Sequence, residues 1–368
     1  MTRILVVKLA DLGDLLVATP ALRAIRNAHP TAHIAALVTP HTAAILRGST
    51  AVDEVITFRK ADFDSLGAGA RRLGTAGSLA RRLTTGQWDI VVLLHHLTTW
   101  FGTAKYAALA LATRAPVRAG LDNGRGLFLT HRTTDYGFGT HHEADYWLQV
   151  AALIGGHNVT PTLEITPTEV DREWASGTIA TLDPGQRFAV VHPGSGGFGM
   201  ARRWFPDRFS DVARHLAKHH DLAPLVLAGT AAGESALAAT VTSGAPDARA
   251  VGPAPSPGAL TALLSRAALF IGGDSGVMHL AAAAGTPLVG IFGPTNHRAW
   301  GPYPADDPRR AIVREPLACS PCVYRGHSLG TPAGCAARTC LAFVDASDVI
   351  AAAERVLAVA HRPEASLV

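Results

Sequence analysis

Two carboxylates stand three residues apart near the start of the chain, where they could do acid–base chemistry. Asp11 and Asp14 lie in the segment Lys8–Asp14, directly after the apolar run Ile4–Val7. A carboxylate at a strand-to-helix turn can take a proton from an acceptor hydroxyl. The helix N-terminus favours its ionised form, so it would be a weak base that needs tight positioning. The alternative is that both residues only cap or precede the helix.

A glycine-rich segment followed by two arginines is the first candidate for anion binding. Residues 192–197 (HPGSGG) follow the apolar run Phe188–Val191, and Arg202, Arg203 and Trp204 come shortly after. Free backbone N–H groups and missing Cβ atoms allow phosphate to approach, and a guanidinium adds positive charge. The alternative is an ordinary loop with a solvated arginine pair. No Gly-Lys-Ser/Thr follows, so the segment is not a P-loop, and the first strand lacks the G-x-G-x-x-G of a dehydrogenase.

The segment 272–279 (GGDSGVMH) is the second candidate for ligand binding. Ser275 can cap the helix predicted over 277–284, and the positive end of such a helix favours an anion. Asp274 would repel phosphate and is better suited to ribose or sugar hydroxyls. His279 falls in the first helical turn and could reach a ligand, although a single histidine on a helix is more often structural.

All four cysteines lie close together in the sequence, as Cys319-x2-Cys322-x12-Cys335-x4-Cys340. Two close pairs of thiolates are compatible with a structural tetrahedral zinc site, and free thiols are the alternative. Their clustering rules out a disulfide framework spread through the fold.

Basic residues and histidines in the first half are candidates for binding an acceptor. The pairs Arg59-Lys60, Arg71-Arg72 and Arg81-Arg82 could recognise a phosphorylated or carboxylated molecule, although a solvated helix face is the commoner explanation. His141-His142-Glu143 is insufficient as a metal site, because adjacent residues do not share a helix face.

The elements that position these residues alternate between strand and helix. Apolar runs predict strands at 4–7, 33–38, 52–57 and 89–94, with a helix from about 15 to 25. A Gly- and Pro-rich stretch at 155–186 is predicted to be a linker. The pattern then restarts, with strands at 188–191, 225–228, 269–272 and 288–292 and helices at 209–219, 260–266 and 277–284. Two doubly wound parallel sheets follow, with ligands expected at the carboxyl ends of their strands in a cleft between two domains.

Composition limits the classes of protein. Of 368 residues, 48% are hydrophobic and 17% charged, which supports a sizeable core and argues against disorder. The net charge of +4 is too weak for a dedicated nucleic-acid binder. No apolar stretch approaches the ~20 residues of a membrane span, and charged residues interrupt the N-terminal apolar segment. A cytoplasmic location is therefore expected.

Three blocks together resemble one family. Residues 4–22 (ILVVKLADLGDLLVATPAL), 190–216 (VVHPGSGGFGMARRWFPDRFSDVARHL) and 270–302 (FIGGDSGVMHLAAAAGTPLVGIFGPTNHRAWGP) are similar to the heptosyltransferases, the ADP-heptose:lipopolysaccharide transferases of glycosyltransferase family 9. The ordered set is more specific than any single block. The chain departs from the pattern at Ala10-Asp11, where serines are usual.

The resemblance implies a GT-B fold of two Rossmann-like domains. Residues 1–165 would bind the acceptor, 166–185 would link the domains, 186–345 would bind the nucleotide-sugar donor, and 346–368 would form a C-terminal helix and tail. It implies an inverting transfer from an ADP-sugar that needs no metal or cofactor, with Asp14 as the catalytic base. The implied donor-binding residues are Ser195, Gly196, Arg202, Arg203, Glu234, Asp274, Ser275, Gly276 and His279, with Glu234 on the ribose. The expected acceptor-binding residues are Asp11, Arg59, Lys60 and His142.

Several alternatives for the partners stay open. The acceptor would be a glycolipid core or a small-molecule glycoside, without nucleic acid and with at most peripheral contact with the inner face of the cytoplasmic membrane. A nucleotide-sugar epimerase would use the same fold without an acceptor. A non-catalytic nucleotide-sugar-binding protein would need the donor site but not Asp14.

Overall fold

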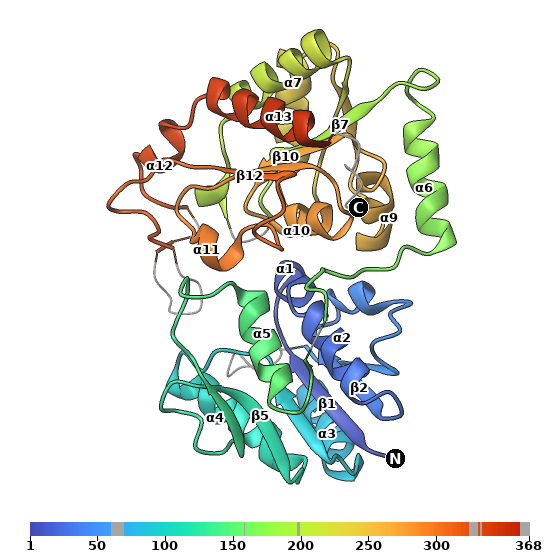
Figure 1. Cartoon of the computed structure of the whole chain (residues 1–368), viewed down its shortest axis with the longest axis vertical. Coiled ribbons are helices and arrows are strands. Elements are labelled where there is room, and N and C mark those ends of the chain that lie inside the picture. The colour runs from blue at the N-terminus through green and yellow to red at the C-terminus, as the bar shows by residue number, and fades with distance from the viewer. Residues whose placement is uncertain (60–69, 158, 197–198, 324–329, 332, 361–368) are drawn as a thin grey trace, which may run out of the picture. The chain divides into compact units, whose positions relative to one another are not determined.

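The computed structural model describes residues 1–59, 70–157, 159–196, 199–323, 330–331 and 333–360. The chain divides into two compact units, Met1–Thr166 and Pro167–Val368 (Figure 1). No helix among the described residues is both long enough and apolar enough to cross a membrane.

The first unit is built on a six-stranded sheet in which all neighbouring strands are parallel. Its order is β3-β2-β1-β4-β5-β6. The strands are β1 (Arg3–Lys8), β2 (His33–Val38), β3 (Glu54–Thr57), β4 (Ile90–Leu93), β5 (Val117–Asp122) and β6 (His131–Thr134). The chain starts in the middle at β1, runs out to β3, and crosses back to β4. This order is that of a doubly wound fold, as the alternation of strands and helices predicts.

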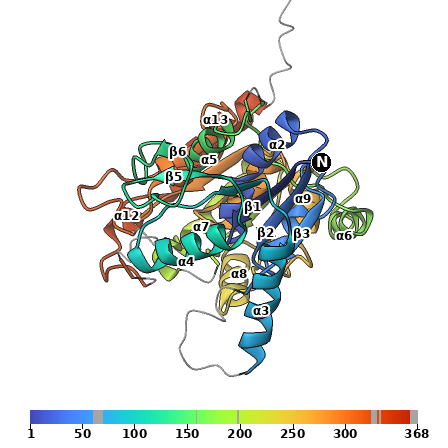
Figure 2. The ribbon, with the colours of Figure 1, turned by 90° about the horizontal axis from the view of Figure 1, so that it is seen from below.

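Helices cover both faces of this sheet. Alternate residues of a strand face opposite sides, so Leu5 and Val7 of β1 point to one face and pack there with Leu83 of α3 (Ala70–Thr85) and Tyr106 of α4 (Trp100–Ala112). Helices α3 and α4 also contact each other (Figure 2). On the other face, α5 (Glu143–Ala152) packs against α2 (Thr19–Ala28) and contacts β4 to β6.

The single helix predicted over 15–25 is two helices. Helix α1 (Leu12–Leu16) ends before α2 begins, and Pro20 lies in the first turn of α2, where its missing N–H is tolerated. The carbonyl of Leu16 would lose its helical partner to this proline. It instead accepts a hydrogen bond from the Thr19 hydroxyl at 2.7 Å.

The second unit repeats the same strand order. Its sheet runs β12-β11-β10-β7-β8-β9, again with all neighbours parallel. The strands are β7 (Phe188–His192), β8 (Ala223–Leu227), β9 (Arg249–Val251), β10 (Leu269–Gly273), β11 (Leu288–Ile291) and β12 (Arg310–Val313). Here β7 and β10 are the central neighbours, as β1 and β4 are in the first unit.

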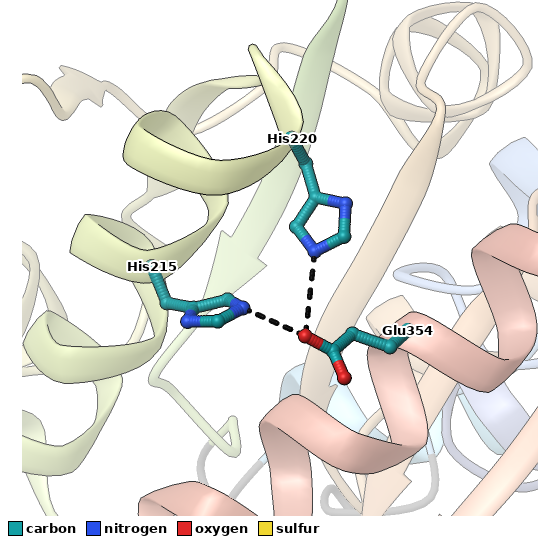
Figure 3. Close-up of side chains that lie close together, drawn as sticks. All are labelled: His215, His220 and Glu354. Atoms are coloured by element: carbon teal, nitrogen blue, oxygen red, sulfur yellow. Dashed lines mark hydrogen bonds and ion pairs between the residues drawn. The ribbon is translucent and has the colours of Figure 1, made fainter.

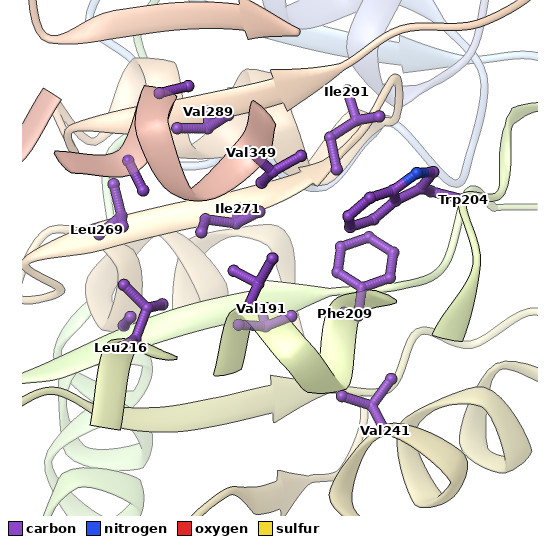
Figure 4. Packing of buried hydrophobic residues seen from close by; sticks show 14 of the residues in the cluster. Val191, Trp204, Phe209, Leu216, Val241, Leu269, Ile271, Val289, Ile291 and Val349 are labelled. Carbon is purple, nitrogen blue, oxygen red and sulfur yellow. The ribbon is translucent and has the colours of Figure 1, made fainter. Parts of the chain in front are cut away.

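The core of the second unit lies between this sheet and three helices. Val191 and Ile271 face α7 (Pro206–His220), α8 (Glu234–Gly244) and α13 (Ala346–Ala360), and Trp204 meets Phe209 edge to face at 4.9 Å between ring centroids (Figure 4). Helices α9 (Pro257–Leu264) and α10 (Gly276–Ala283) contact each other, and α10 contacts β10 and β11. Shorter helices are α11 (His297–Trp300) and α12 (Thr339–Ala342).

The segment 166–185, predicted as a linker, is largely structured and belongs to the second unit after Thr166. It contains α6 (Glu169–Ile179), whose capping residue Thr168 exchanges hydrogen bonds with Asp171. Asp171 also accepts a hydrogen bond from Ser256, and α6 packs on α9. The predicted C-terminal helix over 346–368 is α13, and it is part of the same core.

Candidate active site

The predicted donor residues gather where the central strands of the second sheet end. Because β7 and β10 are neighbours whose following helices leave toward opposite sides, their carboxyl ends mark the point at which doubly wound sheets bind ligands. Residues 192–196 follow β7, and Asp274, Ser275 and Gly276 follow β10. The sequence blocks therefore meet in one place although they lie about 80 residues apart.

Arg202 joins these two strand ends. Its guanidinium donates one hydrogen bond to the Ser195 carbonyl at 3.0 Å, and Nη1 lies 3.3 Å from Asp274 Oδ2. The Arg202 side chain is 18% exposed and that of Asp274 is 8% exposed. The residue predicted to hold the diphosphate is thus already oriented by the residue predicted to bind hydroxyl groups.

The Glu234 carboxylate is hydrogen-bonded to the backbone of the glycine-rich turn. The backbone N–H groups of Ser195 and Gly196 each donate to Glu234 Oε1 at 2.8 Å, and Arg203 Nη2 lies 3.6 Å from the same oxygen. The side chain of Glu234 is only 2% exposed. This corrects the expectation that these two amides face the diphosphate, because a carboxylate of the same chain already uses them.

Two glycines make room for this carboxylate. A Cβ on Gly194 would lie 2.5 Å from Glu234 Cδ, and one on Gly229 would lie 1.8 Å from Glu234 Oε2. Gly196 has a φ of +70°, which favours glycine for a different reason. Gly194 and Gly229 therefore leave space for the Glu234 carboxylate, and Gly196 allows the backbone conformation of the turn.

Glu234 stays ionised despite its burial. Burial by itself raises the pKa of Glu234, but the neighbouring His192 and the N–H groups of Gly196 and Ser195 outweigh it and bring the pKa to about 2. His192 Nε2 lies 3.9 Å from Glu234 Oε2, at the end of β7. The turn is therefore organised around a permanent negative charge.

Ser275 and His279 complete the second strand end. Ser275 is the N-cap residue of α10 with extended backbone (φ −155°), yet its side chain makes no capping hydrogen bond. Its Oγ is buried, and within the described part of the chain it has no hydrogen-bond partner. A ligand oxygen would supply that partner. His279 is buried on the same helix, with 2% of its surface exposed.

In the first unit, the predicted base lies at the equivalent strand end. Asp11 is the N-cap residue of α1, and its N–H donates to Asp14 Oδ2 at 3.1 Å. The capping role that the sequence left open is therefore real for both residues. It also fixes the Asp14 carboxylate directly after β1. His41 Nε2 lies 3.6 Å from Asp11 Oδ1.

A buried ammonium sits beside this carboxylate. Lys8, the last residue of β1, is 3% exposed, and its Nζ lies 3.8 Å from the ring centroid of Trp147. Burial lowers the pKa of Lys8, and the negative charges of Asp14 and Glu143 oppose that shift. The side chain of Lys8 therefore interacts electrostatically with both the predicted base Asp14 and the buried Glu143.

His96 is held between two buried carboxylates. Its Nδ1 donates to Asp135 Oδ2 at 2.9 Å and its Nε2 to Glu143 Oε1 at 3.1 Å. Burial lowers the pKa of His96, but the two carboxylates outweigh it and raise the pKa to about 9. Tyr146 packs edge to face on the imidazole, and burial raises the pKa of this tyrosine to about 12. His96 is therefore a buried imidazolium at neutral pH.

Sequence reasoning did not single out His96 or Asp135. A signal was present, since His95-His96 follow the predicted strand 89–94, which is the neighbour of β1 in the sheet. His142, predicted to bind the acceptor, is the N-cap residue of α5 and accepts from Ala144 N–H at 3.1 Å. Arg59 is exposed after β3, and Lys60 lies outside the described residues.

The four cysteines surround one small cavity in the second unit. They line a space of about 40 Å³, with Cys340 buried and Cys319, Cys322 and Cys335 exposed. Burial raises the pKa of the Cys322 and Cys340 thiols, and the neighbouring cysteines add to both shifts. The four thiols thus line one cavity, and a structural zinc there stays a prediction.

The chain belongs to glycosyltransferase family 9 (heptosyltransferase), whose family model matches residues 76–332. It is a glycosyltransferase, as the sequence resemblance predicts. "Lipopolysaccharide heptosyltransferase 3" of Escherichia coli is 24% identical over 313 residues, covering 79% of this chain and 83% of the relative.

Two solved structures share the fold. The glycosyltransferase family 9 protein of Veillonella parvula superimposes with a TM-score of 0.76 at 24% identity, over 97% of both chains. The E. coli heptosyltransferase WaaC, solved with ADP, has a TM-score of 0.67 at 21% identity, over 86% of this chain and 94% of that chain. The predicted α/β GT-B fold class is confirmed.

Proposed function

We propose that this protein transfers a heptose, or a related sugar, from an ADP-sugar to a hydroxyl group of a glycolipid core or a small-molecule glycoside, with inversion at the anomeric carbon. The observation that carries the proposal is Arg202, held between Ser195 and Asp274 at the ends of β7 and β10, beside the buried Ser275 hydroxyl. The names of the relatives support heptose, and the ADP in the WaaC structure supports the nucleotide.

In the first chemical step Asp14 acts as the base. Its carboxylate accepts the proton of the acceptor hydroxyl, and the oxygen attacks the anomeric carbon on the face opposite the leaving group. The bond between that carbon and the diphosphate breaks, and ADP leaves with the electron pair. Lys8 is buried at the end of the preceding strand, where the charge of Asp14 opposes the lowering of the pKa of Lys8 by burial.

The second unit neutralises the charge that builds on the diphosphate. The Arg202 guanidinium, the Ser275 hydroxyl and the N-terminus of α10 are oriented before the donor arrives. Preoriented groups of this kind are worth ~3–4 kcal/mol each in other enzymes. In the proposed mechanism they take the place of a divalent metal, and the amides of Ser195 and Gly196 act indirectly by holding Glu234.

The location and the partners are part of the same proposal. The reaction takes place in the cytoplasm, and a lipid-linked acceptor would be met at the inner face of the cytoplasmic membrane. No nucleic acid takes part. The four cysteines hold a structural zinc that takes no part in the transfer.

The experiment that tests the donor is a calorimetric titration with ADP, UDP, GDP and dTDP in the presence of chelator. ADP should bind selectively without metal. A preference for another nucleotide would remove heptose from the proposal, and no binding of any nucleotide would contradict it. Incubating the protein with ADP-heptose alone distinguishes transfer from epimerisation, because an epimerase changes the donor without an acceptor.

The base is tested with Asp14→Asn, which should lower turnover by ~10²–10⁴-fold and leave the ADP dissociation constant unchanged. Asp348→Asn is a matched control. Asp348 accepts the Asp345 N–H at 2.8 Å at the start of α13, so it makes the same kind of helix cap as Asp14. Turnover of Asp14→Asn within a few-fold of the control would rule out Asp14 as the base.

A further inference from the structure

Two histidines and a glutamate converge on one point between α7 and α13, away from the strand ends described above. His215 and His220 lie on the last turns of α7, and Glu354 lies on α13 (Figure 3). One ligand atom from each residue lies within 4.8 Å of the other two. Figure 3 shows both imidazole rings turned toward the same carboxylate oxygen of Glu354.

The distances match the edges of a metal coordination sphere. Glu354 Oε1 lies 3.0 Å from His215 Nε2 and 3.7 Å from His220 Nε2. Zinc binds imidazole nitrogen and carboxylate oxygen at ~2.0–2.2 Å in a tetrahedron, so its ligand atoms stand about 3.3–3.5 Å apart. The two distances fall on either side of this value, and the two imidazole nitrogens lie within 4.8 Å of each other.

A second observation concerns His220 alone. Its Nε2 is buried and has no hydrogen-bond partner among the residues that the structure describes, because 3.7 Å to Glu354 is too long for a hydrogen bond. A buried ring nitrogen without a hydrogen-bond partner carries a free-energy cost. A metal ion placed between the three residues removes that cost.

The two histidines that meet Glu354 are not the pair that helical spacing predicts. His215 and His219 are four residues apart and share a helix face, and their ring centroids lie 4.6 Å apart. The structure instead directs His220 to Glu354. It does so at the C-terminus of α7, where Asp221 adopts a left-handed conformation (φ 52°) and ends the helix.

We infer that His215, His220 and Glu354 form a zinc site that joins the end of α7 to α13. Two imidazoles and one carboxylate are a donor set that zinc uses, with water in the fourth position. The site belongs to the second unit and takes no part in the transfer reaction, so it stands independently of the proposed function. Its consequence is a metal-dependent stability of the C-terminal helix.

The test compares the zinc content of the full-length protein with that of His215→Ala/His220→Ala after equilibration with Zn²⁺ and gel filtration. The parent should retain one more equivalent of zinc than the double variant, and any zinc on the cysteines cancels in the difference. At a free zinc concentration of 100 Kd the unfolding midpoint of the second unit of the parent should rise by about 5–10 °C relative to chelator, and that of the variant should rise less.

The control is His131→Ala/His157→Ala, which removes two exposed histidines of the first unit and should keep the extra equivalent. Glu354→Gln keeps the shape of a half-exposed side chain, so it tests the site even if the histidine variant folds poorly. It should weaken zinc binding by at least tenfold. Equal zinc content in parent and double variant, or binding by Glu354→Gln within twofold of the parent, would overturn the inference.

Discussion

Replacing Glu234 by glutamine removes the negative charge around which the turn after β7 is organised. The substituted amide keeps an oxygen that can accept from Ser195 or Gly196. It loses the charge that faces Arg203 and His192. We therefore expect the second unit to be destabilised without a change in the packing of its core.

The magnitude follows from the pKa of Glu234, which falls from 4.5 to about 2 in the folded protein. A shift of this size corresponds to about 3 kcal/mol of folding free energy at neutral pH. Because the folded pKa is the lower one, this contribution is complete above pH ~4.5 and is lost as the pH falls toward 2. At pH 3 about half of it should remain.

The assay is urea unfolding of the parent and of Glu234→Gln at pH 7 and pH 3, followed by circular dichroism. Hydrogen exchange of peptides covering residues 188–196 assigns the change to the second unit. The variant should be less stable by about 2–3 kcal/mol at pH 7, and the gap should narrow by about half at pH 3. Glu169→Gln, which removes a highly exposed carboxylate paired only with Arg172, is the control and should change little. A gap of equal size at both pH values would refute the reasoning.

Three further substitutions test other parts of the structure. His96→Gln should cost about 3 kcal/mol at pH 7; since the folded pKa of His96 is raised, the gap to the parent should close as the pH rises from ~6.5 through about 9, which thermal melts across that range would detect. Gly229→Ala should displace the Glu234 carboxylate and weaken ADP binding severalfold in calorimetry, whereas Gly177→Ala, whose Cβ would meet nothing within 4 Å in α6, should leave binding unchanged. Phe209→Ala should cost about 3–5 kcal/mol by leaving a cavity beside Trp204, and a loss under 1 kcal/mol in urea unfolding would contradict the packing in Figure 4.

The central strands could be predicted from the sequence because they are buried on both faces and form continuous apolar runs. β2 has the predicted bounds, β1 and β4 differ from prediction by one residue at each end, and β7 and β10 extend one residue further at their C-terminal ends. Of the edge strands, β3 was predicted over 52–57, whereas β6, β9 and β12 were not. β6 reads HRTT and β9 reads RAV, and both are largely exposed, so they carry no apolar run. Only pairing with a neighbouring strand identifies them.

The candidate site could likewise be predicted only in part from the sequence. Ser195, Asp274 and Asp14 could be located because each lies in the loop or first helical turn that follows a central strand. Their contacts with distant parts of the chain could not be predicted, although the resemblance named Glu234. Glu234 meets Ser195 across 39 residues and His96 meets Glu143 across 47, so these contacts depend on where helices α8 and α5 pack.

The internal carboxylate in the turn after β7 has a consequence for the cycle of binding and release. The backbone N–H groups of this turn already donate to Glu234 of the same chain, so the turn is ordered before a ligand binds. Binding then loses little conformational entropy in residues 192–196, and departure of a product leaves these residues in the shape that the next ligand requires. In the proposed transfer this turn therefore needs no reordering between one donor and the next, and changes in nucleotide preference can arise in the surrounding side chains while the turn keeps its shape.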